Sequence, residues 1–164
     1  MYHKSTGNWY IRSLVSDVPI TFGQNWGGGP GMVPVSGDYN GDGVWDLAVY
    51  DERTHFWHWY IRSLGPGLPI TFGQQWGIDN GVPVSGDYNG DGVWDLAIYQ
   101  TTTGDWYIRP LGPGPDIAYG RNWGNAGMVP VSGDYNGDGI YDLAVYIPER
   151  LFVDKNEIKV REEK

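Results

Sequence analysis

The sequence predicts an all-β fold made of short strands joined by tight turns. The 164-residue chain contains 26 Gly, 11 Pro, 9 Trp and 12 Tyr, and only 19% of its residues are charged. Gly and Pro disfavour helices and favour turns, whereas aromatic residues favour strands. The chain also contains an internal repeat: the segment GDYNGDGVWDLAVY at 37–50 returns with few changes at 86–99 and 133–146. The length is that of one ordinary domain.

Each repeat unit is predicted to hold four strands. The leading Asp of the repeated segment falls at Asp38, Asp87 and Asp134, and the other landmarks recur with it in steps of 47 to 50 residues. In chain order the strands of a unit are VPVSGDY, DLAVY, WYIRS and ITFGQ, each bounded by turn-forming residues. The predicted strands are 33–39, 46–50, 59–63 and 70–74 in the first unit and 82–88, 95–99, 106–110 and 117–121 in the second. The segment 50–60, which joins two strands of the first unit, is two residues longer than its counterpart 99–107.

The first and last repeat units of the chain are incomplete. Strands three and four of a unit come first, at 9–13 and 20–24, and strands one and two come last, at 129–135 and 142–146. The two terminal halves are therefore expected to complete one sheet, which would leave no sheet edge open. Residues 148–164 have a different composition, without Gly or Trp and with ten charged residues from 149 onward. We expect a repeat domain over 2–147 and a charged, non-repeat tail over 148–164 that has no chemistry of its own.

The repeated segment has the ligand spacing of a calcium loop. Oxygen-bearing side chains stand at alternate positions of a glycine-rich turn, and the residue at position seven can offer its backbone carbonyl. Carboxylate, amide and carbonyl oxygens suit Ca²⁺ better than Zn²⁺ or copper. An EF-hand is not expected, because its acidic twelfth position is Val49, Ile98 or Val145 here. The sequence predicts about three Ca²⁺ per chain, held by Asp38, Asn40, Asp42, Val44 and Asp46, by Asp87, Asn89, Asp91, Val93 and Asp95, and by Asp134, Asn136, Asp138, Ile140 and Asp142.

These motifs resemble a known family. The D-x-N-x-D-G-x-x-D loop, the apolar DLAVY that follows it and the FG of ITFGQ together resemble the FG-GAP/VCBS repeat of integrin α-subunits and of related bacterial and fungal lectins. The resemblance covers residues 2 to about 147, although the third copy of the ITFGQ segment, at 117–121, has Tyr119-Gly120 in place of FG. It implies one four-stranded β-propeller blade per unit and calcium in each loop.

Three blades are too few for an ordinary propeller, which has roughly four to eight. We therefore expect two chains to associate head to tail as a homodimer with a six-bladed ring, unless the chain belongs to a longer array. The alternative architecture is a monomeric β-trefoil with three four-stranded units. Its Q-x-W element is matched at Gln24 and Gln74 but is broken by Arg121, and a trefoil gives no reason for the calcium loops.

Composition narrows the function classes. The net charge is −9, and much of the acidity lies in the repeated loops, so no basic stripe for a nucleic-acid partner exists. No apolar run reaches the roughly 18 residues of a membrane span, there is no Cys, and no signal-peptide segment is seen in this chain. The sequence predicts a non-enzymatic, calcium-binding module with a structural, adhesive or protein-binding role outside the cell or at its surface.

Two alternatives remain open. A lectin would use recurring aromatic residues between neighbouring blades, namely Trp26, Trp76, Trp123, Trp45, Trp94 and Tyr141. Such residues usually pack one blade against the next instead. A non-catalytic part of a polysaccharide-degrading enzyme is the less favoured alternative. No catalytic residues are predicted, because the three His residues (His3, His55 and His58) do not recur with the repeat and no Ser is spaced for a triad.

Overall fold

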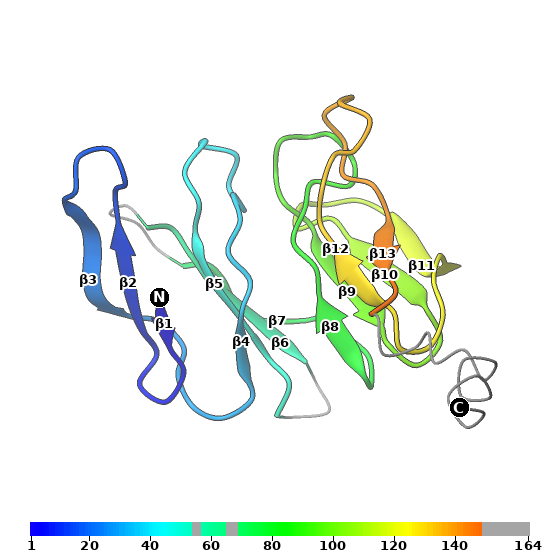
Figure 1. Cartoon of the computed structure of the whole chain (residues 1–164), viewed down its shortest axis with the longest axis horizontal. Helices are drawn as coiled ribbons and strands as arrows, with labels where there is room; N and C mark the ends of the chain where they lie inside the picture. Colours follow the sequence, from blue (N-terminus) through cyan, green and yellow to red (C-terminus); the bar gives the residue numbers. More distant parts are fainter. Residues whose placement is uncertain (54–56, 65–68, 149–164) are drawn as a thin grey trace, which may run out of the picture.

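The computed structural model describes residues 1–53, 57–64 and 69–148. Within these ranges the chain forms thirteen strands in four antiparallel sheets and no helix. Figure 1 shows the sheets following one another in chain order from the N-terminal sheet at one side of the molecule to the other side, where the C-terminal sheet overlaps the sheet before it in this view. The expectation of an all-β repeat fold is confirmed.

The two central sheets are four-stranded meanders, one for each whole repeat unit. Consecutive strands pair in both sheets, so the spatial order is β4-β5-β6-β7 in one and β11-β10-β9-β8 in the other. The first contains β4 (Met32–Pro34), β5 (Leu47–Asp51), β6 (His58–Arg62) and β7 (Pro69–Gln75). The second contains β8 (Gly81–Pro83), β9 (Leu96–Gln100), β10 (Asp105–Arg109) and β11 (Ala118–Asn122).

The two terminal sheets are partial. The N-terminal sheet has the order β1-β2-β3, with β1 (Tyr2–His3), β2 (Asn8–Arg12) and β3 (Pro19–Asn25). The C-terminal sheet is the hairpin of β12 (Val129–Val131) and β13 (Ala144–Tyr146). Strands β2 and β3 correspond to strands three and four of a unit, and β12 and β13 to strands one and two, as the repeat predicts.

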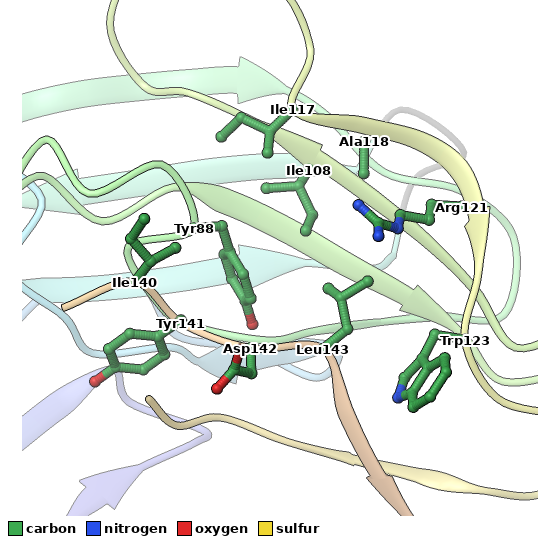
Figure 2. A pocket seen from close by; sticks show the side chains of 10 residues that line it. All are labelled: Tyr88, Ile108, Ile117, Ala118, Arg121, Trp123, Ile140, Tyr141, Asp142 and Leu143. Carbon is green, nitrogen blue, oxygen red and sulfur yellow. The ribbon is translucent and has the colours of Figure 1, made fainter. Parts of the chain in front are cut away.

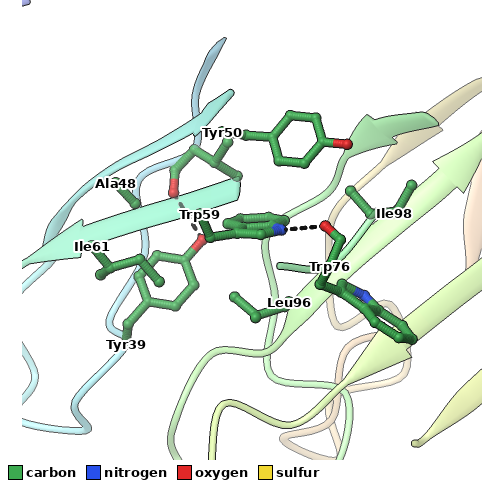
Figure 3. Packing of buried hydrophobic residues seen from close by; sticks show 9 residues of the cluster. Tyr39, Ala48, Tyr50, Trp59, Ile61, Trp76, Leu96 and Ile98 are labelled. Atoms are coloured by element: carbon green, nitrogen blue, oxygen red, sulfur yellow. Dashed lines mark hydrogen bonds between the residues drawn. The ribbon is translucent and has the colours of Figure 1, made fainter. Parts of the chain in front are cut away.

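The hydrophobic core lies between sheets rather than inside one of them. Trp59 and Ile61 on β6 are fully buried together with Leu96 and Ile98 on β9 of the next sheet. Figure 3 shows this packing, in which the indole nitrogen of Trp59 donates a hydrogen bond of 2.9 Å to the carbonyl oxygen of Trp76. The same type of cluster recurs on either side, because the repeat places Trp and Ile of one sheet against Leu and Val or Ile of the next.

Several sequence expectations differ in detail from the structure. The seven-residue strand predicted at 33–39 is regular only over Met32–Pro34; beyond it, Val35 N donates a 2.9 Å hydrogen bond to Ala48 O and Gly37 forms an isolated bridge with Asp46 before the loop begins. Strand β1 was not predicted; it forms because Tyr2 packs on Trp9 at 4.8 Å between ring centroids. Within the described ranges the sheets form neither a closed barrel nor a closed ring. Part of the long connection at 50–60 and nearly all of the tail, 149–164, lie outside the described residues.

Candidate calcium-binding loops and the joints between sheets

Each D-x-N-x-D-G-x-x-D segment forms a nine-residue loop that links the first two strands of a unit. The backbone closes it by hydrogen bonds from Asp46 N to Gly37 O at 2.7 Å, from Asp95 N to Gly86 O at 2.8 Å and from Asp142 N to Gly133 O at 2.8 Å. The two glycines inside each loop have positive φ, for example 73° at Gly41 and 81° at Gly43. This left-handed backbone favours glycine over other residues, so the glycines are needed for the tight path of the chain.

The first Asp of each loop organises the turn that follows it. Asp38 Oδ1 accepts a hydrogen bond from Gly41 N at 2.7 Å, and its Oδ2 accepts one from Gly43 N at 2.8 Å. Asp87 and Asp134 make the same two bonds to the equivalent glycines, at the same distances. In the third loop the amide of Gly139, assisted by that of Gly137, keeps the pKa of Asp134 below its ordinary value, because these bonds stabilise the ionised form of that carboxylate.

The second and third ligand positions lie on the exposed rim of the loop. Asn40 Oδ1 accepts a hydrogen bond of 2.9 Å from Asp42 N, and Asp42 Oδ1 accepts one of 2.8 Å from Val44 N. Their counterparts at 89 and 91 and at 136 and 138 make the same contacts. The residues predicted to use their carbonyls lie two positions further along each loop, after a glycine; they are Val44, Val93 and Ile140.

The last Asp is buried in the first two loops, whereas Asp142 of the third loop is half-buried. Asp46 and Asp95 are both only 1% exposed. Asp46 Oδ2 accepts a hydrogen bond of 2.8 Å from Tyr39 N, whereas its Oδ1 is buried without a hydrogen-bond partner. Burial, together with the nearby charges of Asp42 and Asp38, raises the pKa of Asp46 to about 6, and the same causes raise the pKa of Asp95 to about 7.

The donor set of these loops fits calcium. Three carboxylates, an amide oxygen and backbone carbonyls are hard oxygen donors, and the unpartnered oxygen of Asp46 is a buried anionic group that a cation would satisfy. In the described ranges, however, no three acidic or imidazole side chains converge as a metal cluster. Most of the loop carboxylate oxygens are instead engaged with amides of their own loop.

The aromatic residues singled out as sugar-binding candidates form two series at the joints between sheets. The first series is Trp26, Trp76 and Trp123, which follow the last strand of each sheet. The indole nitrogen of Trp26 donates a 3.0 Å hydrogen bond to the carbonyl of Tyr60 in the next sheet, and Arg62 lies 5.7 Å from the Trp26 ring centroid. Trp76 is likewise covered by Arg109, at 4.0 Å.

The second series is a ladder of rings along the loops. Trp45 lies 5.0 Å from Trp94, and Trp94 lies 5.4 Å from Tyr141, measured between ring centroids. The backbone joins the loops as well, since Trp94 N donates to Asp38 O at 2.9 Å and Tyr141 N donates to Asp87 O at 2.8 Å. Both series thus connect successive sheets.

Sequence reasoning missed the glycine that opens each loop segment. A methyl group at Gly37 would overlap the ring of Trp94, and one at Gly86 would overlap the ring of Tyr141. The signal was present, because this glycine precedes the first Asp in all three units. From the sequence alone, this glycine is explained equally well as a turn residue, because its contact with the neighbouring sheet is not known.

The fold and the loops define an all-β repeat protein built from meander sheets that pack face to face through aromatic residues. Neither the models of known families, nor the curated proteins, nor the solved structures contain a match to this chain. A search of the described residues for a helix long and apolar enough to cross a membrane found none.

Proposed function

We propose that this protein is a non-enzymatic, calcium-binding β-propeller module of the FG-GAP/VCBS type, with a structural, adhesive or protein-binding role outside the cell. The observation that carries the proposal is the threefold recurrence of one loop whose oxygen donors have calcium-ligand spacing. Each copy begins with a carboxylate held by the amides of its own loop glycines.

Calcium would act on folding rather than on a reaction. The ion would be held by the three carboxylates, the Asn amide and the position-seven carbonyl of each loop. Its charge would offset the mutual repulsion of these carboxylates and the cost of burying Asp46 and Asp95. A ligand that binds only the folded chain raises its stability by mass action. Extracellular modules of this kind bind Ca²⁺ at about 10⁻⁴ to 10⁻³ M, which is why we place the protein outside the cell.

The proposal includes a closed ring of blades. The two whole meander sheets and the two partial ones would amount to three blades per chain, and a propeller needs roughly four to eight. Two copies that shared their partial sheets would form a six-bladed ring with no open edge.

Thermal unfolding with and without calcium tests the proposal. The protein is first treated with EDTA, and Ca²⁺ is then added to about 5 mM, ten times a dissociation constant near 5 × 10⁻⁴ M. The midpoint of thermal unfolding is expected to rise by several degrees. Isothermal titration is expected to give about three sites per chain. An unchanged midpoint in EDTA and in calcium would contradict the proposal.

A matched variant separates calcium binding from general charge effects. Asp42→Asn alters an exposed loop oxygen of the first unit and is expected to remove one of the three sites while leaving the fold intact. Asp79→Asn, outside the loops, removes the same charge and should leave the stoichiometry unchanged. Magnesium at the same concentration controls for ionic strength.

A further inference from the structure

We infer that the two ends of this chain form a joint with a second copy of the chain, in which β13 pairs with β2 of the partner in one definite register. The inference takes up the self-association in the proposed function and specifies its residues. The evidence is a set of contacts that recurs where neighbouring sheets of the chain meet. At the two ends of the chain the residues that would make the same contacts are separated from one another.

The first half of the joint is the exposed tryptophan at the C-terminal end. Trp76 is only 8% exposed because Arg109 and Tyr119 of the next sheet cover it, whereas the equivalent Trp123 is 57% exposed. By the repeat, the residues that would cover Trp123 are Arg12 and Phe22, both at the N-terminal end.

Arg12 forms an ion pair comparable to that of Arg109. Its guanidinium bonds the Asp17 carboxylate at 2.8 Å, as that of Arg109 bonds Asp116 at 2.7 Å. Phe22 is exposed as well, packed edge-on against Tyr10 just as Tyr119 packs against Tyr107.

A hollow lies beside Trp123 where the next sheet would insert a side chain. It measures about 400 Å³ and is lined by Ile108, Ile117, Ala118, Leu143 and Trp123 among others, as Figure 2 shows. At the preceding joint Tyr107 packs against the equivalent cluster, and at the first joint Tyr60 does so. The third member of this series is Tyr10 of the N-terminal sheet.

The second half of the joint is the third loop. Tyr39 is 1% exposed because the ring of Trp94 packs on it, but the equivalent Tyr135 is 63% exposed. The residue that corresponds to Trp94 and Tyr141 is Trp45, which is itself 58% exposed. At an internal joint Trp94 N donates to Asp38 O. The equivalent bond at the composite joint would run from Trp45 N of the partner to Asp134 O.

Strand pairing sets the register. In the first whole sheet Ala48 lies opposite Ile61, Val49 opposite Tyr60 and Tyr50 opposite Trp59. The same register places Ala144 opposite Ile11, Val145 opposite Tyr10, and Tyr146 opposite Trp9. Val145 pairs with Pro130 of β12, and because proline has no N–H, the N–H and carbonyl of Val145 point to the open edge.

Strand β1 occupies part of that edge within the same chain. Tyr2 lies opposite Trp9, the position that Tyr146 would take, and its ring packs on Trp9 as Tyr50 packs on Trp59. The two-residue strand pairs with Asn8 and Trp9, and Met1 exchanges two backbone hydrogen bonds with Tyr10, at 2.6 and 2.8 Å, so Ile11 and Arg12 keep an open edge. Pairing with β13 therefore requires β1 to leave.

The occupant is a second copy because the two half-joints of one chain lie at opposite ends of its row of sheets (Figure 1). At the joints within the chain, equivalent residues of neighbouring sheets already pack against one another. A copy that offers β2, Arg12 and Phe22 also offers Trp45 in the sheet that follows, so both halves of the joint would close together.

Disulfide trapping tests the register, and the chain is suited to it because it has no Cys. Ala144 and Ile11 would face each other as a non-hydrogen-bonded pair, with Cα atoms about 4.5 Å apart, which a disulfide can span. Copies carrying Ile11→Cys and copies carrying Ala144→Cys, mixed and oxidised, are expected to give a disulfide-linked heterodimer. Ser13→Cys in place of Ile11→Cys lies two residues further along the same face, beyond the disulfide reach of Ala144, and should give at least tenfold less product. Equal yields, or no product, would overturn the inference.

Three further experiments test whether the occupant is a second copy. A chain carrying both cysteines should form linked dimers or larger species; a linked monomer would show that the chain closes on itself, and would overturn the second copy. Light scattering should give twice the 18.3 kDa of the chain. Arg12→Ala, an exposed change expected to preserve the monomer fold, should weaken this association about tenfold, whereas Lys4→Ala should not; equal effects would count against the joint.

The outcome is separable from that of the proposed function. If calcium raises the unfolding midpoint and no in-register disulfide forms, the joint is wrong and the calcium proposal stands. If the disulfide forms in register and calcium leaves the midpoint unchanged, the calcium proposal fails and the joint stands.

Discussion

The guanidinium carbon of Arg109 lies 4.0 Å from the centroid of the Trp76 ring, so a cation at the end of one sheet covers the tryptophan at the end of the sheet before it. The repeat makes this contact a property of the fold, because Arg62 covers Trp26 in the same way at 5.7 Å. Both pairs join sheets that share no strand hydrogen bonds. Side-chain contacts between sheets, together with the loop backbone bonds, therefore hold the row together.

Arg109→Ala is expected to destabilise the protein. The change removes a cation–aromatic contact to a buried ring, worth about 1–2 kcal/mol, and the partly exposed ion pair with Asp116. Chemical denaturation monitored by Trp fluorescence measures the loss. Lys4→Ala, which removes another exposed cation, is the control and should change the free energy of unfolding by less than about 0.5 kcal/mol. Equal losses for both variants would show that the contact with Trp76 has no special weight.

Gly37→Ala is expected to loosen the joint between the two whole sheets. The added methyl group would overlap the ring of Trp94, and overpacking of this kind costs about 1–3 kcal/mol. The thermal midpoint reports this cost. Gly112→Ala serves as the control, because nothing lies within 4 Å of the added atom and the φ angle there is not positive. A midpoint equal to that of the parent would mean that the ring moves aside freely.

Asp51→Asn should lower stability in a pH-dependent way. The buried carboxylate of Asp51 accepts two hydrogen bonds from the Arg53 guanidinium, at 2.8 and 2.7 Å, and these keep the pKa of Asp51 below its ordinary value. A carboxyl group whose pKa is lowered on folding contributes stability above its unfolded pKa of about 3.9, and this contribution is lost as the pH falls through the folded value.

The difference in unfolding free energy between parent and variant should be about 2 kcal/mol at pH 6 to 7 and should shrink below pH 4. Urea denaturation across this range measures it. The exposed pair of Arg12 and Asp17 provides the comparison, since Asp17→Asn should cost less than about 1 kcal/mol at any pH. If the difference in unfolding free energy between parent and variant grew as the pH fell, the predicted direction of the pH dependence would be wrong.

Trp59→Phe and Trp106→Phe should behave alike. Each indole is fully buried and donates a 2.9 Å hydrogen bond to the carbonyl of the tryptophan that follows the last strand of its sheet. Loss of this bond and of part of the ring should cost each variant about 2–3 kcal/mol. Denaturation of the two variants under identical conditions tests the equivalence of the repeats. A difference above about 1 kcal/mol would show that the two joints are not equivalent.

The sequence by itself determined the strands, the loops and their repetition. Alternation of β-branched and aromatic residues is a local signal, and β6 and β10 formed close to where WYIRS and WYIRP predicted them. The spacing of Asp and Gly is local too, and the positive φ of Gly41 and Gly43 follows from it. The identity of a bound ion and the number of blades remain predictions.

Only the tertiary structure decided which face of each sheet meets which neighbour. Identical residues acquire different surroundings according to their place in the row, so Trp76 is buried while Trp123 is exposed. Likewise, Asp46 has a buried oxygen without a partner, although its position in the sequence resembles that of the exposed Asp42. The physical reason is that burial depends on contacts between units distant in sequence, whereas strand and turn preferences depend on neighbouring residues along the chain.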